Sequence, residues 1–172
     1  FSAKNIFMKI LITGGAGFVG RHFTRHFLEA GDNVCVIDSL AKYTGGISPK
    51  EWPLFDPWDY EDFTFFNKDC RELTKAYDNF DLVLHLAAMV GGRLMIENNP
   101  LAVADDLSID AAFWQWAIKA KPKKIICFSS SAAYPIMFQQ EIGYKLLDEE
   151  LIKSLCNKDN LLRHLHSQGF LL

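Results

Sequence analysis

Four glycines fall within seven consecutive residues near the start of the chain, in the segment Gly14-Gly15-Ala16-Gly17-Phe18-Val19-Gly20. The run before it, Met8 to Thr13, is apolar and stops at a glycine, which is typical of a strand buried on both faces. The run after it, Phe18 to Ala30, has apolar residues at helical spacing and is followed by Gly31, a helix stop. The segment therefore predicts a tight turn from a buried strand into a helix.

The spacing of these glycines, GxxGxxG, is typical of a turn that approaches a pyrophosphate. One glycine makes the turn, one lets backbone amides approach the phosphates, and one allows the helix to pack closely on the strand. The helix N-terminus adds free N–H groups and the positive end of its dipole. We expect a dinucleotide to contact the turn at Gly14, Ala16, Gly17, Phe18 and Val19.

An acidic residue ends the next predicted strand. That strand runs from Asn33 to Ile37, and Asp38 follows it, 24 residues after Gly14. A carboxylate near this offset accepts hydrogen bonds from the ribose hydroxyls and repels a 2′-phosphate. Ser39 comes next and no arginine stands there, which favours NAD over NADP. The plainer alternative is a glycine loop that serves helix packing, beside a solvated aspartate.

The rest of the chain alternates between strand and helix patterns. Further strands are predicted at 63–67, 81–88 and 123–129, helices at 71–79 and 100–120, and a long proline-containing loop at 39–62. Such alternation predicts an α/β fold with a parallel sheet and helices on both faces. With the strand order 3-2-1-4-5, the fifth strand lies at the edge of the sheet.

Composition and cysteine spacing exclude several classes of protein. A net charge of −3 gives no basic surface for nucleic acid. No apolar run is long enough to cross a membrane, and no secretory signal is visible. The four cysteines form no CxxC pair, so we expect reduced thiols, no metal site and a cytoplasmic location. His22 and His26 are interpreted as an exposed helix face, and His85 as a core or cofactor-adjacent residue.

Several segments together resemble the extended short-chain dehydrogenase/reductase family, the NAD-dependent nucleotide-sugar epimerases and dehydratases. The resemblance lies in Thr13 to Gly20, in the pair Asp69-Cys70, in Leu86-Ala87-Ala88, and in Ser129 to Tyr134. It implies a Rossmann-type sheet of about five strands that binds NAD, with adenine near Asp69 and Cys70 and the cofactor above Leu86, Ala87 and Ala88. It also implies that Ser130 is the catalytic serine and that Gly91, Gly92 and Arg93 approach the sugar.

The resemblance implies a mechanism as well. NAD removes hydride from a sugar carbon, while a tyrosine activated by a lysine four residues later takes the hydroxyl proton. Here the sequence departs from the family pattern, because none of its five tyrosines is followed by lysine at that spacing. Leu107 also stands where the family has an asparagine that bends the long helix. Both departures argue against turnover by this chain alone.

Chain length leads to the same expectation. At 172 residues, the chain has no room for the family's C-terminal substrate domain, so we expect that domain to be absent. We divide the chain into extra N-terminal residues 1–7, a NAD-binding domain at 8–140 and a helical tail at 141–172. The exposed fifth strand and the tail are expected to mediate a homodimer or contact with a partner.

Three hypotheses remain open at this stage. The first is the cofactor-binding part of a nucleotide-sugar epimerase or dehydratase, inactive by itself. The second is a non-catalytic dinucleotide-binding protein that acts through a partner. The third is an NADP-dependent sugar reductase. No metal is expected in any of them.

Overall fold

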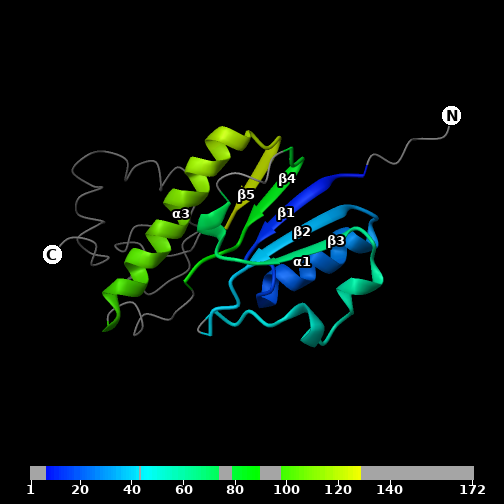
Figure 1. The fold of residues 1–172 in the computed structure, drawn as a ribbon, viewed down its shortest axis with the longest axis horizontal. Coiled ribbons are helices and arrows are strands. Elements are labelled where there is room, and N and C mark those ends of the chain that lie inside the picture. The colour runs from blue at the N-terminus through cyan, green and yellow to red at the C-terminus, as the bar shows by residue number, and fades with distance from the viewer. Residues whose placement is uncertain (1–6, 43, 74–78, 90–97, 129–172) are drawn as a thin grey trace, which may run out of the picture. The chain divides into compact units, whose positions relative to one another are not determined.

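The computed structural model describes residues 7–42, 44–73, 79–89 and 98–128, all of which belong to the first of two units, divided after Phe128. Five strands form one sheet: β1 (Lys9–Thr13), β2 (Asn33–Asp38), β3 (Phe63–Asn67), β4 (Leu82–His85) and β5 (Lys124–Cys127). Their order is β3-β2-β1-β4-β5, and every neighbouring pair is parallel (Figure 1). The α/β fold class and the order 3-2-1-4-5 are therefore confirmed.

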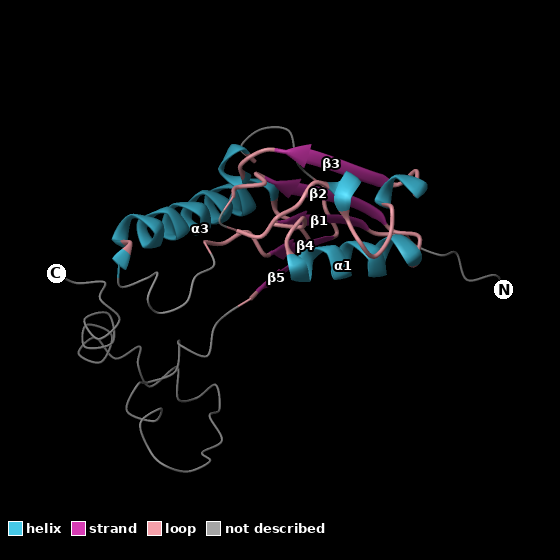
Figure 2. Ribbon diagram, turned by 90° about the horizontal axis from the view of Figure 1, so that it is seen from below, coloured by secondary structure: helices cyan, strands magenta, loops and turns pink. Residues whose placement is uncertain are grey.

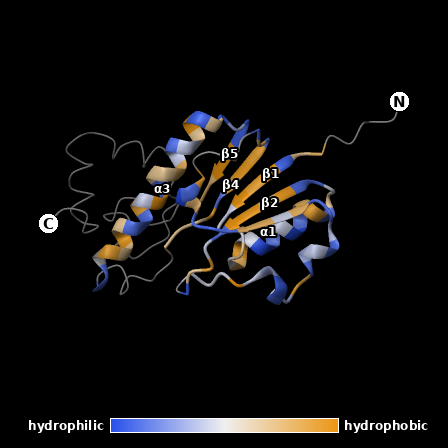
Figure 3. Cartoon of the chain, in the orientation of Figure 1, coloured by the Kyte–Doolittle hydropathy of each residue, from blue (hydrophilic) through white to orange (hydrophobic). Residues whose placement is uncertain are grey.

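The central strand β1 explains why the sheet needs cover on both faces. Its Ile10, Leu11 and Ile12 are fully buried, because β2 and β4 pair with β1 on either side and side chains alternate between the two faces. The strands accordingly carry a nearly continuous apolar sequence, which Figure 3 shows as orange arrows at the centre of the unit.

The alternation divides the core into two layers. On one face, Ile10, Ile12 and Leu84 pack with Leu28 of α1 (Phe18–Glu29) and with Trp52 of the loop after β2. On the other face, the buried residues of α3 (Pro100–Ala120) pack with the strands; the cluster includes Leu11, Ile37, Val83, Phe113, Trp116 and Ala117. The helices thus cover both faces of the sheet, as predicted (Figure 2).

The ends of α3 follow ordinary capping chemistry. Pro100 occupies the first helical position, and the Asn99 side chain accepts a hydrogen bond from the Ala102 N–H. The helix ends at Lys121, which adopts a left-handed conformation with φ of 50°. Along its length Trp116 is buried, whereas Trp114 is 46% exposed.

The boundaries of β4 and of the segment after β3 differ from the prediction. β4 ends at His85 and not at Ala88, because its neighbour β1 ends at Thr13, where Gly14 turns the chain away with φ of +68°. The helix predicted at 71–79 begins as a short 3₁₀ turn, η3 (Cys70–Glu72), and residues 74–78 lie outside the described part. The predicted loop after β2 contains two more 3₁₀ turns, η1 (Pro49–Glu51) and η2 (Pro57–Asp59).

Within the described part of the chain, β5 pairs with β4 and with no other strand. Its residues are exposed or half-buried, including Cys127. Phe128, which follows the strand, is 53% exposed and contacts the ring of Phe23 on α1. None of the described helices is long and apolar enough to span a bilayer.

Truncation of Phe113 to alanine is expected to lower the free energy of unfolding by about 3–5 kcal/mol, because the ring is fully buried between the sheet and α3. Ile118→Ala on the same helix is the matched control, since Ile118 is 72% exposed. Its effect should stay within about 0.5 kcal/mol. Urea unfolding followed by circular dichroism measures both, and equal losses would contradict this description of the core.

Candidate functional site

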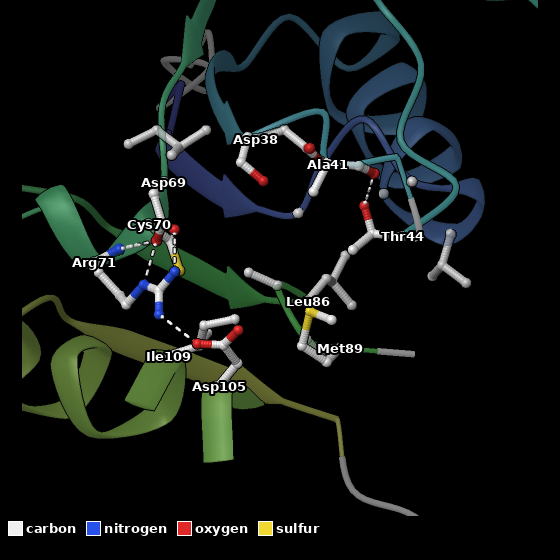
Figure 4. Close-up of a pocket in the computed structure, with 18 of the residues that line it drawn as sticks. Asp38, Ala41, Thr44, Asp69, Cys70, Arg71, Leu86, Met89, Asp105 and Ile109 are labelled. Atoms are coloured by element: carbon white, nitrogen blue, oxygen red, sulfur yellow. Dashed lines mark hydrogen bonds and ion pairs between the residues drawn. The ribbon is translucent and has the colours of Figure 1, made fainter. Parts of the chain in front are cut away.

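A cleft of about 460 Å³ opens where β1, β2 and β4 end at their carboxyl sides, which is where ligands bind in open parallel sheets. The turn after β1, the segments after β2 and β4, η3 and one side of α3 all contribute to its walls (Figure 4). The cleft therefore gathers segments that are far apart in the sequence.

Gly14 lies directly against the backbone of the segment after β4. A Cβ atom added to it would lie 2.6 Å from the backbone nitrogen of Ala87 and 2.7 Å from the carbonyl carbon of Leu86. The φ of +68° also disfavours any side chain at this position. Gly20 has a related constraint, because its added Cβ would lie 2.5 Å from the Cα of Gly15. These two glycines therefore allow the turn to contact the β4 segment and the helix to pack on the turn.

The N-terminus of α1 faces the cleft without competition from its own side chains. Its N-cap residue is Gly17, which has no side chain to accept the first N–H groups, and the first turn contains no acidic residue. Phe18 and Val19 begin the helix and line the cleft. Their N–H groups have no carbonyl partner one turn earlier within the helix, so this end of α1 suits an anion.

Asp38 links β2 to the glycine turn. One carboxylate oxygen accepts from the Ala16 N–H at 3.0 Å, and the other accepts from the Leu40 N–H at 2.8 Å. Burial raises the pKa of Asp38, while these two backbone hydrogen bonds act in the opposite direction. A carboxylate has about four acceptor positions, two on each oxygen. The two backbone hydrogen bonds use one position on each oxygen, so one position on each remains for a ligand. Asp38 and Ser39 both line the cleft.

Asp69 and Arg71 form an ion pair at another wall of the cleft. The guanidinium donates from Nε to one carboxylate oxygen of Asp69 at 3.0 Å and from Nη2 to the other at 2.6 Å. Its Nη1 donates to Asp105 and to Ser108 of α3, at 3.2 and 2.8 Å. The hydrogen bonds from Arg71 hold the pKa of Asp69 below its usual range. The two charges therefore stabilise one another and connect η3 to α3.

A second polar connection lies beneath the cleft. The Thr13 hydroxyl lies 2.7 Å from Nδ1 of His85, and His85 Nε2 lies 3.1 Å from a carboxylate oxygen of Asp110 on α3. The same hydroxyl accepts from the N–H groups of Leu86 and Ala87, both at 3.3 Å. His85 is 7% exposed, so it belongs to the core. It is connected to the cleft through the Thr13 hydroxyl, which binds the lining residues Leu86 and Ala87.

The thiol of Cys70 lines the cleft and is buried. Burial raises its pKa to about 12, so the group stays a neutral thiol near neutral pH and is no nucleophile there. No group of three metal-ligating side chains occurs among the described residues.

The structure brings most of the predicted site residues together. The cleft is lined by Gly14, Gly17, Phe18, Val19, Asp38, Ser39, Asp69, Cys70, Leu86, Ala87 and Ala88. Ala16 does not line it: the residue is fully buried and its N–H is used by Asp38. Ser130, Gly91, Gly92 and Arg93 lie outside the described residues.

Sequence reasoning missed Arg71, which it placed in a helix. One sequence pattern could have indicated its position, because Asp69 and Glu72 have the spacing of a capping box. The structure contains this capping box, which orients the residues between its two ends. Thr44, Met89 and Asp105 also line the cleft, and no sequence pattern marked them. They enter it because the loop after β2 and the segment after β4 both begin at the carboxyl edge of the sheet, and the first half of α3 lies beside that edge.

Comparison with known proteins identifies the family. The model of the NAD dependent epimerase/dehydratase family matches residues 10–153. The chain belongs to this family. The match covers both the glycine turn and the β4 segment, which together make the floor of the cleft.

Individual relatives within the family cover more than one activity. A UDP-glucose 4-epimerase of Lactobacillus helveticus is 34% identical over 131 residues, which cover 73% of this chain and 36% of that protein. A dTDP-glucose 4,6-dehydratase of Salmonella typhimurium is 32% identical over 120 residues, covering 62% of this chain and 32% of that protein. The chain thus spans about a third of the length of these curated relatives.

A solved structure of the Bordetella bronchiseptica enzyme WbmG in complex with NAD has a TM-score of 0.57 and 25% sequence identity to this chain. The match covers 78% of this chain and 41% of that chain. The Rossmann-type arrangement of the family member described here is therefore shared with a protein whose structure contains NAD.

Two glycines allow the close approach at the turn to be tested. Gly14→Ala should lower the free energy of unfolding by about 2–5 kcal/mol, because the new methyl group meets the Ala87 backbone at a left-handed φ. Gly45→Ala is the matched control: Gly45 has φ of +71°, but nothing lies within 4 Å of an added Cβ. It should cost only about 1–2 kcal/mol. Equal costs in urea unfolding would show that the contact with Ala87 contributes nothing.

Proposed function

We propose that this chain binds NAD in the cleft at the carboxyl edge of its sheet, as the cofactor-binding part of a nucleotide-sugar epimerase or dehydratase. The observation that carries the proposal is the pairing of a bare helix N-terminus with Asp38 on the adjacent strand. The first suits a pyrophosphate and the second suits a ribose, so the residues present fit a dinucleotide.

The fit can be stated residue by residue. The N–H groups at the start of α1, at Phe18 and Val19, would donate to the pyrophosphate, and the absence of a side chain at Gly17 keeps that approach open. The free acceptor positions of Asp38 would take the two ribose hydroxyls. Leu86 and Ala87 supply the floor below them.

The charges around the cleft favour NAD over NADP. Among the described lining residues, Asp38, Asp69 and Asp105 are acidic and Arg71 is the sole cation. Arg71 already binds both Asp69 and Asp105, so it neutralises them and does not stand ready for a 2′-phosphate. A phosphate placed beside Asp38 would therefore meet like charge with no partner.

In this proposal NAD, when bound, supplies the hydride acceptor for oxidation of a sugar carbon. The described residues bind and orient the cofactor, and Ser130 is proposed to hydrogen bond to the reacting hydroxyl. Gly91, Gly92 and Arg93 are proposed to approach the sugar. The nucleotide-sugar class of substrate is supported by the names of the relatives, among them UDP-glucose 4-epimerase and dTDP-glucose 4,6-dehydratase.

A second candidate is a non-catalytic dinucleotide-binding protein that acts through a partner or a second copy. It is supported by the missing Tyr-x-x-x-Lys pair and by Leu107, which is 55% exposed on α3. The general base that the resemblance implies, a tyrosine activated by its lysine, is therefore missing from this chain. We therefore propose that this chain alone performs no turnover, with the tail at 141–172 and the β5 edge serving association. A cytoplasmic location is part of the same proposal.

Titration calorimetry with NAD tests binding directly. NAD should bind and raise the melting temperature, because a ligand at about 100 times its Kd stabilises the folded state by about 2.7 kcal/mol. Saturating NAD with no heat signal and no thermal shift would refute both candidates. NADP should bind more weakly, and a preference for NADP would support a sugar reductase instead.

Replacement of Asp38 by asparagine should weaken NAD binding by about 10- to 100-fold, since hydrogen bonds to a charged group contribute about 1.5–3 kcal/mol. Asp32→Asn is the matched control. Asp32 is also a buried aspartate that accepts a backbone N–H, from Met8 at 2.9 Å, but it does not line the cleft. The NAD affinity of the Asp32→Asn variant should stay within a factor of about two of the affinity of the unmodified chain. Equal losses in calorimetry would show that Asp38 acts through stability alone.

Turnover tests the non-catalytic candidate. The chain is incubated with NAD and with UDP-glucose or dTDP-glucose, and products are followed by chromatography. We expect no epimerised or dehydrated product. Product formation would refute the non-catalytic candidate and would require a general base other than a Tyr–Lys pair.

A further inference from the structure

We infer that His85 is a positioning residue for the proposed cofactor cleft, and that its protonation releases the segment on which the cofactor lies. The inference rests on the proposed function in one respect, because its binding test uses NAD. It starts from a continuous hydrogen-bond network between four parts of the protein: the segment after β4, the end of β1, β4 itself and α3. The network runs from the N–H groups of Leu86 and Ala87 through Thr13 and His85 to Asp110.

The partners on both sides of the imidazole determine its tautomer. Asp110 carries only acceptor atoms as a carboxylate, so Nε2 of His85 must carry the proton that lies between them, at 3.1 Å. In the neutral ring Nδ1 is then an acceptor, and the Thr13 hydroxyl must donate to it across 2.7 Å. The lone pairs of that hydroxyl are left for the N–H groups of Leu86 and Ala87. Each donor in this network therefore has an acceptor.

The direction of the Thr13 hydroxyl matters for the cleft because its two backbone partners lie in the floor. Leu86 and Ala87 line the cleft, and the Leu86 N–H also lies 3.0 Å from the Thr13 carbonyl oxygen. Gly14 packs against the same two residues, where even a methyl group has no room. A shift of this backbone therefore changes the shape of the turn that faces the pyrophosphate.

The ring itself has little freedom to respond. His85 stacks on Phe113 with ring centroids 3.7 Å apart and an angle of 6° between the planes. His85 is only 7% exposed, and Phe113, on which its ring lies, is fully buried. Protonation therefore cannot be accommodated by turning the imidazole toward solvent.

Protonation of His85 puts a proton on Nδ1, which faces the Thr13 hydroxyl. The Thr13 hydroxyl oxygen would then face three donors, Nδ1–H of His85 and the N–H groups of Leu86 and Ala87, but it has only two lone pairs. Its own proton would also lose its acceptor. The hydrogen bonds from Leu86 and Ala87 are therefore lost or weakened. Burial lowers the pKa of His85, and the hydrogen bond to Asp110 partly offsets this. The neutral form is thus favoured in the folded chain above the ordinary histidine pKa of about 6.5, and this stabilisation is lost as the pH falls below it.

Other titratable groups face His85 from the elements around it. Asp106 and Asp110 approach from α3, and both favour the protonated ring. Cys127 lies opposite His85 in the β4–β5 register, and Cys70 lies on η3 in the same core layer. Burial raises the pKa of both thiols, so neither changes charge in the acidic range where His85 titrates.

Nuclear magnetic resonance of the whole chain without ligand tests the network directly. The ¹⁵N shifts of His85 should show the tautomer with the proton on Nε2, and the amide protons of Leu86 and Ala87 should titrate with the same midpoint as the ring. The tautomer with the proton on Nδ1, or amides that do not follow His85, would overturn the inference without any substitution.

Two conservative variants should move that midpoint in opposite directions. Thr13→Val removes the donor that stabilises the neutral ring, so the pKa of His85 should rise. Asp110→Asn removes the negative charge that stabilises the protonated ring, so the pKa should fall. His26→Gln is the matched control, because His26 is an exposed histidine on α1 that does not line the cleft. Shifts of the same sign in the first two variants would overturn the assignment.

NAD affinity is then measured by calorimetry from about pH 8 to about pH 5.5. NAD should bind the form with neutral His85 more tightly, so the pKa of His85 should be lower in the NAD complex than in the free chain. The affinity should fall about tenfold for each pKa unit of that difference. The midpoint of this loss should follow the His85 pKa in Thr13→Val and Asp110→Asn and stay unchanged in His26→Gln. A constant midpoint in all variants would assign the loss to Asp38 and overturn the inference while the proposed function stands. If the unmodified chain binds no NAD even at pH 8, the proposed function fails, and the resonance measurements still decide the network.

Discussion

The contact between the glycine turn and the backbone of Leu86 and Ala87 sets the geometry on which the rest of the site depends. It forms because Gly14 has no side chain and can adopt a left-handed φ. The Gly14 N–H also donates to the Ile37 carbonyl at 2.8 Å, so the turn is held to β2 as well as to the β4 segment. Three neighbouring strands thus end against one short piece of chain, and the cleft opens directly above it.

Carboxylates provide most of the remaining connections around the cleft, and each binds a different partner. Asp38 accepts two backbone N–H groups, while three aspartates of α3, Asp105, Asp106 and Asp110, bind Arg71, the Met89 N–H and His85. These bonds connect α3 to η3, to the segment after β4 and to β4 itself. Of these aspartates, Asp38 and Asp105 also line the cleft, so packing and the proposed choice of ligand depend in part on the same residues.

Prediction from sequence succeeded where the signal was local and periodic. The helix at 100–120 and the strand at 63–67 have the predicted bounds, because Pro100 marks the first turn of the helix and an aromatic-rich run marks the strand. It failed where an end depends on a neighbour, as at β4, which stops at His85 because β1 stops at Thr13. It also missed Arg71, whose contacts with Asp105 and Ser108 join residues more than thirty positions apart.

The sequence by itself determined the parallel α/β sheet, the glycine turn and the acidic residue after the second strand, because spacing along the chain dictates each of them. Membership of the NAD-dependent epimerase/dehydratase family follows from the same motifs. Only the tertiary structure decided that Ala16 gives its N–H to Asp38, that Arg71 pairs with Asp69 in the cleft wall, and that His85 lies between Thr13 and Asp110. Those contacts depend on which donors and acceptors come together when the chain folds. Most of them join residues far apart in the sequence, so no periodic pattern in the sequence predicts them.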